Sequence, residues 1–252
     1  MPPLPAPPVT PPQPCPVVQE QRPWSGAGLS PAGEGRGPVP LRPPALTAAQ
    51  GSPPPYAPGD YRHRLATTPA GWPIRPHWCV WIEPVASSGP AALWDQRWWR
   101  AVSAAVSTWR QHLPISLVDD PRQAQVLVHR RRPPIRNHRA SHGRAELQLL
   151  EVKRLQVWRL EPRVDLQISP GQAEPAMQAT ALHELGHAFG LWGHSDQPGD
   201  AMAVSPGPTP VLQLSPRDRA TLRWLQAQPG LSSGGHPPEP PAPAPAPTAK
   251  GR

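Results

Sequence analysis

The sequence predicts one α/β (α+β) domain over residues 71–230, flanked by disordered segments over residues 1–70 and 231–252. Three observations lead to this prediction. Proline makes up 44 of the 252 residues and crowds the two ends, and such stretches bury too little apolar surface to offset the entropy of ordering. All but one of the 11 Trp lie in the middle portion, which is long enough for one core. In that portion, apolar residues recur with the spacing of a strand in some stretches and with the spacing of a helix in others.

The predicted elements follow in order along the middle portion. Residues 78–82 read Trp-Cys-Val-Trp-Ile, and their alternation predicts a first strand. Residues 90–112 predict a helix whose apolar stripe packs in the core rather than binding a ligand. That stripe consists of Trp94, Trp98, Ala101, Ala105 and Trp109. Further strands are predicted over residues 115–118, 125–129, 145–152, 155–160 and 164–169, followed by a helix over residues 175–189.

The candidate metal-binding and catalytic side chains lie in residues 183–194, which read His-Glu-Leu-Gly-His-Ala-Phe-Gly-Leu-Trp-Gly-His. His183 and His187 are four residues apart, so a helix places both imidazoles on one face, where they can bind one zinc ion. Glu184 lies about 100° further around the helix. It is therefore beside the metal without being a ligand, which suits a base that deprotonates zinc-bound water.

The end of this run supplies a third candidate ligand. Gly190 can adopt the left-handed conformation that ends a helix and turns the chain back. The chain then delivers His194 toward the other two imidazoles. Three protein ligands and a water are the composition of a catalytic zinc site rather than a closed structural one.

The run resembles the extended zinc motif of the metzincin metallopeptidases, His-Glu-x-x-His-x-x-Gly-x-x-His, and is closest to the matrixin-like branch. The family places its third His three residues after the Gly, whereas here Gly193 is inserted before His194. We expect the loop to absorb the extra residue, because Gly suits a small bulge and Ser195 continues the matrixin-like pattern. The resemblance also implies a Met in a tight turn beneath the zinc, and Met202 follows the turn signal Pro198–Gly199.

The resemblance covers roughly residues 165–228 and implies the architecture. A metzincin-like domain has a twisted mixed sheet, an active-site helix and a small C-terminal subdomain with a last helix. The sequence agrees with that last helix, because Ser215 is a good N-cap, Pro216 suits the first helical position and Asp218 lies in the first turn.

The function implied is that of a zinc metalloendopeptidase. One Zn²⁺ on His183, His187 and His194 activates a water, Glu184 acts as general base, and a peptide bond is hydrolysed. We expect a protein or peptide substrate, held extended by a sheet edge within residues 145–152, and a monomeric enzyme. Two alternatives stay open: a catalytically inactive, zinc-stabilised peptide-binding module, and a basic polyanion-binding or partner-binding protein.

The formal net charge is +8, and Arg130, Arg131, Arg132, Arg136 and Arg139 make a basic loop. We interpret this loop as a solvated basic face, because no aromatic interleaving or nucleic-acid motif accompanies it, and we expect no nucleic-acid partner. No stretch is long enough to span a membrane.

The two cysteines leave several roles open. Cys79 lies in the first predicted strand and is interpreted as a buried thiol. Cys15 lies in the N-terminal Pro-rich segment, where it could pair with Cys79 or act like the zinc-binding propeptide Cys of some matrixins, although the Pro-Arg-Cys-Gly context is absent. The resemblance suggests an extracytoplasmic protein, whereas residues 1–30 show no secretory apolar run.

Overall fold

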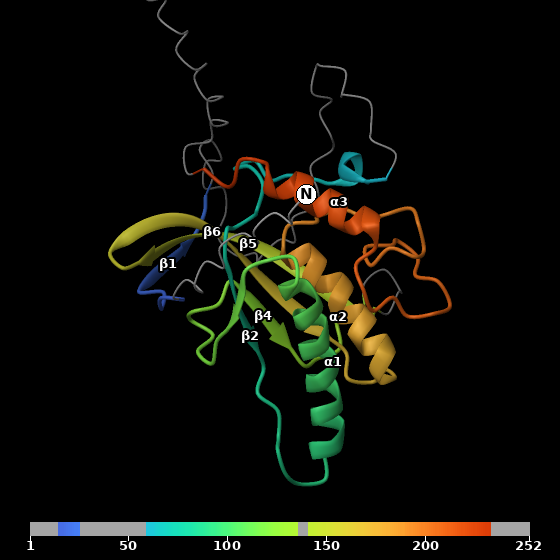
Figure 1. Ribbon diagram of the computed structural model, residues 1–252. Helices are drawn as coiled ribbons and strands as arrows, with labels where there is room; N and C mark the ends of the chain where they lie inside the picture. The colour runs from blue at the N-terminus through green and yellow to red at the C-terminus, as the bar shows by residue number, and fades with distance from the viewer. Residues whose placement is uncertain (1–14, 26–58, 136–140, 233–252) are drawn as a thin grey trace, which may run out of the picture.

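The computed structural model describes residues 15–25, 59–135 and 141–232 (Figure 1). Its strands are β1 (Glu20–Pro23), β2 (Trp78–Ile82), β3 (Ile115–Leu117), β4 (Val126–His129), β5 (Gly143–Arg154) and β6 (Val157–Ile168). Its helices are the short 3-10 helix η1 (Arg62–Arg64), α1 (Ala92–Arg110), α2 (Glu174–Ala188) and α3 (Pro216–Gln226). The prediction of a mixed α/β fold is confirmed. No helix in these described ranges has the length and apolar character needed to cross a membrane.

The strands form one six-stranded mixed sheet in the order β1-β5-β6-β4-β2-β3. β6, β4, β2 and β3 run parallel to one another, and β5 is antiparallel to both β6 and β1. Helices α1 and α2 lie together against one face of this sheet (Figure 1). The core therefore fills the layer between the two helices and the sheet, and it extends beneath α2 to α3.

Two fully buried Trp residues of α1 fasten the helix to the rest of this layer. The indole N–H of Trp98 donates to the carbonyl of Ile168 at 3.0 Å, and that of Trp109 donates to the carbonyl of Leu182 at 3.0 Å. A buried Trp needs such a partner for its single polar group. The second bond joins α1 directly to α2, the helix that carries the paired histidines.

Trp94 departs from the predicted core stripe of α1. Its side chain is 58% exposed, whereas the other four members of the stripe are buried. Trp94 lies in the first turn of α1, which extends beyond the sheet (Figure 1), so no strand lies opposite it. The Arg97 guanidinium lies 4.4 Å from the centre of its ring and covers the ring instead.

The prediction of three separate strands between residues 145 and 169 was wrong. The structure has one long hairpin, in which β5 and β6 pair from Gly143–Ile168 at the open end to Arg154–Val157 at the turn. Leu155 and Gln156 form the turn with φ values of 48° and 65°. Positive φ at both central residues is the requirement of a type I′ hairpin turn, which Asn and Gly usually meet, so the residue types did not reveal it.

Pro162 also looked like a strand breaker, yet it lies inside β6. It stands opposite Leu149, whose carbonyl points away from β6 and accepts a hydrogen bond from Trp24. The pair is therefore a non-hydrogen-bonded one, in which β5 needs no N–H from position 162. On its other side β6 meets β4 only from Val164 onward, so no ladder bond is lost there either.

The predicted disordered N-terminal segment needs correction at two places. Residues 20–23 form β1, which pairs with β5, and Cys15 forms a disulfide with Cys79, so Cys79 is not a free thiol. Residues 59–70 pack against the C-terminal part of the domain, where Tyr61 is fully buried and donates to Asp218 at 2.7 Å. The remaining residues of the two predicted Pro-rich tails lie outside the described residues, apart from a few at their edges.

Candidate metal centre

The three predicted histidines converge on one point of the structure. The candidate ligand atoms of His183, His187 and His194 all lie within 4.8 Å of one another. The ring centres are 4.9 Å apart for the first pair, 5.2 Å for His183 and His194, and 4.8 Å for His187 and His194. The residue inserted before His194 therefore does not move its ring away from the other two.

Two of the rings are held by their Nδ1 atoms. Nδ1 of His183 lies 2.8 Å from the carbonyl oxygen of Ala201, and Nδ1 of His187 lies 2.8 Å from that of Leu191. A carbonyl accepts only from a protonated nitrogen, so these bonds fix the tautomer and leave each Nε2 with a free lone pair. This is the arrangement in which metal-binding histidines are commonly oriented.

Burial keeps the rings neutral. It lowers the pKa of His183, and it lowers the pKa of His187 well below its usual value, with further contributions from the neighbouring imidazoles. The pKa of His194 is also lowered, first by partial burial and then by His183. Neutral imidazole is the form that binds a metal ion, so the donor set is ready for a cation at neutral pH.

The end of α2 and the turn beyond it shape the ligand loop. Gly190 has a φ of 105°, as expected for a helix-ending glycine, and a Cβ there would lie 2.8 Å from the Ile74 side chain. The carbonyl that holds His187 comes from Leu191, immediately after this turn. The Trp192 ring then stacks on His187 with ring centres 5.4 Å apart. No pattern in the sequence indicates this role for Trp192, because nothing in its spacing places it beside His187.

Gly193 fits for a reason that differs from the predicted bulge. Its φ is not in the left-handed region, but a Cβ at this position would lie 2.1 Å from the backbone oxygen of Arg64. The two segments are joined there by the N–H of Ala66, which donates to the carbonyl of Trp192 at 2.7 Å. Close approach of two backbones therefore explains the inserted glycine, and residues 64–66 support the ligand loop.

Glu184 lies between α2 and the start of β5. Its side chain is buried, and a Cβ on Gly143 would lie 2.6 Å from its Oε1. Burial raises the pKa of the Glu184 carboxyl to about 8, while the charge of Arg144 and a hydrogen bond from the backbone of Ala145 act in the opposite direction. A cation on the adjacent histidines would also favour the carboxylate.

Met202 lies under the histidine-bearing helix, as a fully buried side chain. A Cβ on Gly186 would meet its sulfur at 2.2 Å, so the glycine between the two helical histidines makes room for it. The N–H of Ser195 donates to the carbonyl of Met202 at 2.7 Å, and the N–H of Val204 donates to that of Ser195 at 3.0 Å. These bonds tie the Met-containing turn to the residue next to His194.

Asp218 has a larger role than its predicted place in the first turn of the last helix implies. The capping box is present, with Asp218 N–H donating to Ser215 Oγ at 3.0 Å. The buried carboxylate of Asp218 also accepts the N–H of Ala201 at 2.8 Å, besides the Tyr61 hydroxyl. The carbonyl of Ala201 holds His183, so Asp218, which lies on α3, helps to position His183 on α2.

A cavity of about 430 Å³ opens beside His183 and Glu184. Its walls come from α2, from the start of β5 and from the segment after Met202. Most of these lining side chains are small or apolar, including Ala176, Ala179, Ala203, Val204, Pro206 and Val211. The cavity can therefore accept an apolar side chain next to the histidines.

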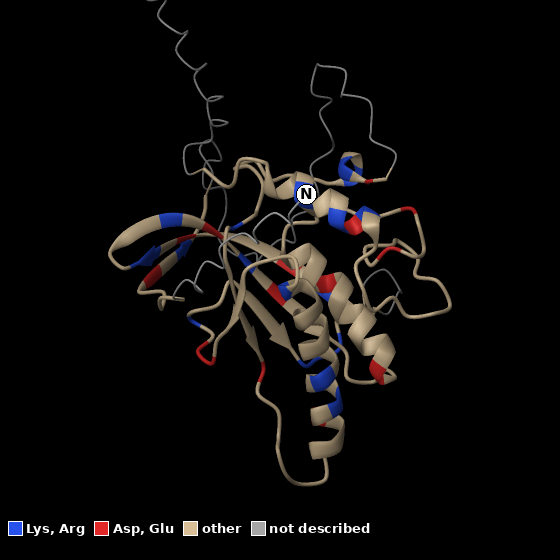
Figure 2. Cartoon of the chain, in the orientation of Figure 1, with Lys and Arg blue, Asp and Glu red and all other residues tan. Residues whose placement is uncertain are grey.

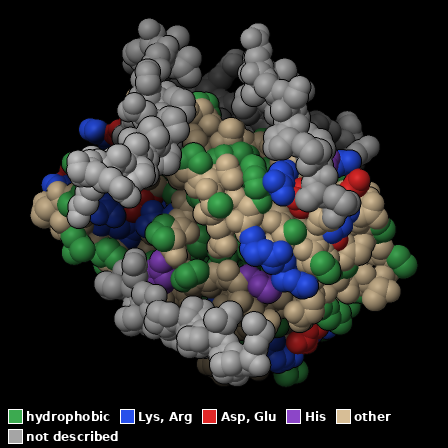
Figure 3. All heavy atoms as spheres, turned by 45° about the horizontal axis from the view of Figure 1, so that its top comes forward, with side chains coloured by type: hydrophobic (Ala, Val, Ile, Leu, Met, Phe, Trp, Pro, Cys, Tyr) green, Lys and Arg blue, Asp and Glu red, His purple; other side chains and the backbone are tan. Residues whose placement is uncertain are grey.

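Basic residues lie on several elements of the fold, and Arg144, next to the lining residue Gly143, acts on Glu184 at this cavity. Figure 2 shows Arg on α1, α3 and η1, and Figure 3 shows basic and His side chains on the face that comes forward. In the predicted basic loop, Arg130 is paired with Asp95, while Arg136 and Arg139 lie outside the described residues. The pairing of Arg130 leaves that loop less basic than its sequence indicated.

Comparisons with known proteins add no assignment. A scan against protein-family models found no match, and a search of curated proteins found no significant match. The functional interpretation therefore stands on the chemistry of the site.

Proposed function

We propose that the chain is a zinc-dependent metalloendopeptidase with a metzincin-like, matrixin-like domain. The observation that carries the proposal is the convergence of three neutral imidazoles, with Glu184 one residue after the first of them. An all-nitrogen set of three ligands suits Zn²⁺ and leaves one position of a tetrahedral site for water. His183, His187 and His194 would hold the ion.

A bound Zn²⁺ would polarise both a water molecule and the carbonyl of the scissile peptide bond. Glu184 would take a proton from that water and later give it to the leaving amine. Its carboxyl is buried and accepts a hydrogen bond from the backbone N–H of Ala145 in β5.

The substrate would bind as an extended peptide on the outer edge of β5. The strand β1 covers this edge only opposite Leu150–Lys153, so part of the predicted 145–152 edge is already paired. Within the described residues, no strand covers β5 between Gly143 and Leu147, beside Glu184. A peptide on this stretch would lie next to the cavity, which would take one of its side chains.

The test compares wild type with Glu184→Gln, which keeps the shape of the side chain but cannot accept a proton. Metal analysis of the purified proteins should find about one zinc per chain in both, and only the wild type should cleave casein. Equal cleavage by the two proteins would rule out Glu184 as the base. Zinc binding without cleavage by the wild type would favour the inactive peptide-binding module.

A further inference from the structure

The outer edge of β5 is divided between the candidate site and a strap, defined here as residues 15–25. The N–H of Ala145 bonds to Glu184 at one end of the edge. Four residues further along, the carbonyl of Leu149 accepts the N–H of Trp24 at 3.0 Å. From there β1 pairs with β5 as far as Lys153. Figure 1 shows β1 beside β5 at the end of the sheet.

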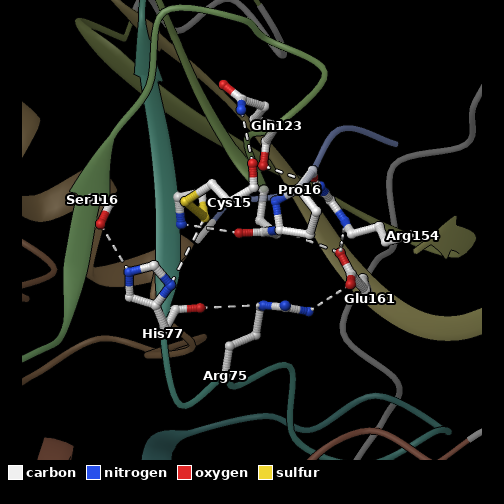
Figure 4. The surroundings of a disulfide bond; sticks show 10 residues. Cys15, Pro16, Arg75, His77, Ser116, Gln123, Arg154 and Glu161 are labelled. Atoms are coloured by element: carbon white, nitrogen blue, oxygen red, sulfur yellow. Dashed lines mark hydrogen bonds and ion pairs between the residues drawn. A yellow bond between two sulfur atoms is a disulfide. The ribbon is translucent and has the colours of Figure 1, made fainter. Parts of the chain in front are cut away.

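The strap is fixed at its N-terminal end. Cys15 is bonded to Cys79 of β2, and its carbonyl accepts from the side chain of Gln123 at 2.8 Å (Figure 4). The next carbonyl, that of Pro16, accepts from Arg154, whose guanidinium is paired with the buried Glu161 at 3.2 Å.

The strap is also fixed at its other end. The Trp24 side chain is partly buried and packs on the apolar cluster of Ala70, Leu149 and Leu160. Leu231, from beyond α3, packs on the same cluster. The strap is therefore held by a covalent bond at one end and by the packing of Trp24 at the other.

We propose that this strap is the end wall of the substrate-binding edge and that Trp24 sets the length of peptide the edge can pair. The inference rests on the proposed function, because it takes the edge beside Glu184 to be where substrate binds. From Ala145 to Leu149 a strand advances about 13 Å, at about 3.3 Å per residue. An extended peptide pairing from the level of Glu184 therefore meets Trp24 after about four residues.

The wall has a consequence for substrate class. Peptide residues beyond about the fourth on this side cannot join the sheet, because the backbone groups of β5 from Leu149 onward are bonded to the strap. The preferred substrates are therefore short extended segments, or loops that leave the edge at Trp24, rather than long strands that run the length of β5.

The experiment uses a ladder of peptides lengthened one residue at a time, first on one side of the cleaved bond and then on the other. For wild type, kcat/KM should rise with length on one side up to about four residues and then stay level. Trp24→Ala removes the packing that holds this end of the strap on β5, so a longer peptide can displace the strap from Leu149. For this variant kcat/KM should keep rising, by about threefold or more over the next two residues, as new backbone bonds form. Trp94→Ala is the matched control, since that Trp is exposed and lies on α1.

A second readout does not need activity. The same ladder is bound to the Glu184→Gln protein by calorimetry, and the affinity should level off at the same length. If both readouts give one length dependence for wild type and Trp24→Ala, the strap is not the wall. If wild type cleaves nothing while binding still levels off at about four residues, the peptidase proposal fails and the wall stands.

Photo-crosslinking covers the case in which Trp24→Ala does not fold. A peptide with a benzophenone at its fifth residue is irradiated with wild-type protein, and the adduct is located by mass spectrometry. We expect the adduct on residues 22–25. An adduct elsewhere on β5, or beyond the strap on the same edge, would overturn the proposal.

Discussion

Gly193→Ala tests how the inserted residue is accommodated next to His194. The new Cβ would lie 2.1 Å from the backbone oxygen of Arg64, 2.8 Å from its carbonyl carbon and 3.1 Å from the Cα of Leu65. A carbon and an oxygen normally approach to about 3.3 Å at closest. About 1 Å must therefore be recovered by moving one backbone, and the bond from Ala66 to Trp192 holds the two together.

The expected cost has two parts. Overpacking of this kind lowers the free energy of unfolding by about 1–3 kcal/mol. A shift of about 1 Å also exceeds the roughly 0.2 Å tolerance of a metal–ligand distance. His194 shows no ring hydrogen bond within the described part of the chain, so its position depends on the loop backbone. We expect zinc affinity to fall by about 10- to 100-fold, as when the support of a ligand is lost.

The assay is a competition titration of metal-free protein with zinc and a chromophoric chelator, alongside urea unfolding. Gly199→Ala is the control, because no atom lies within 4 Å of a Cβ at that position, and it should change neither quantity. His194→Ala marks the loss of the third ligand. If Gly193→Ala binds zinc as tightly as Gly199→Ala does, the close approach does not position His194 and the reasoning is wrong.

Three further predictions concern stability. Met202→Ala should lower the free energy of unfolding by about 2–5 kcal/mol in urea, since the side chain is fully buried; a loss below that of the exposed Val204→Ala would contradict this. Reducing the Cys15–Cys79 bond, which spans 64 residues, should lower it by about 4 kcal/mol, and an unchanged urea midpoint would count against that. Burial first, then the charge of a nearby Arg, lowers the pKa of His77, so the unfolded chain takes up protons first and stability should fall as pH drops below about 6.5. His77→Gln should reduce that dependence, to which the other buried histidines also contribute, and identical profiles would exclude His77 as a cause.

Local patterns predicted the elements whose residues contact one another along the chain. The β2 strand was predicted at residues 78–82, and α2 was predicted within one residue of its observed start and end. The N-cap at Ser215 was likewise predicted from the residue types. In each case the information lies within one or two turns of helix or within one strand, where side-chain spacing determines which face is buried.

Pairing between distant segments had no comparable signal. The strap lies within the Pro-rich N-terminal segment, and nothing near Cys15 indicates that it would lie beside Cys79. Residues 59–70 were assigned to the same segment, yet Tyr61 is buried against Asp218. A disulfide or a buried hydroxyl–carboxylate bond can order a segment that buries little apolar surface of its own, and composition alone does not report it.

The same distinction separates the three candidate ligands. His183 and His187 stand on one helix, so their spacing alone was enough to predict that they meet. His194 reaches them only because the chain at Arg64 approaches Gly193 and because the turn at Met202 is bonded to Ser195. Its presence could be read from the sequence, whereas its position depends on contacts made across more than a hundred residues. A change that shifts the backbone at Arg64 should therefore weaken metal binding, although that segment holds no metal ligand.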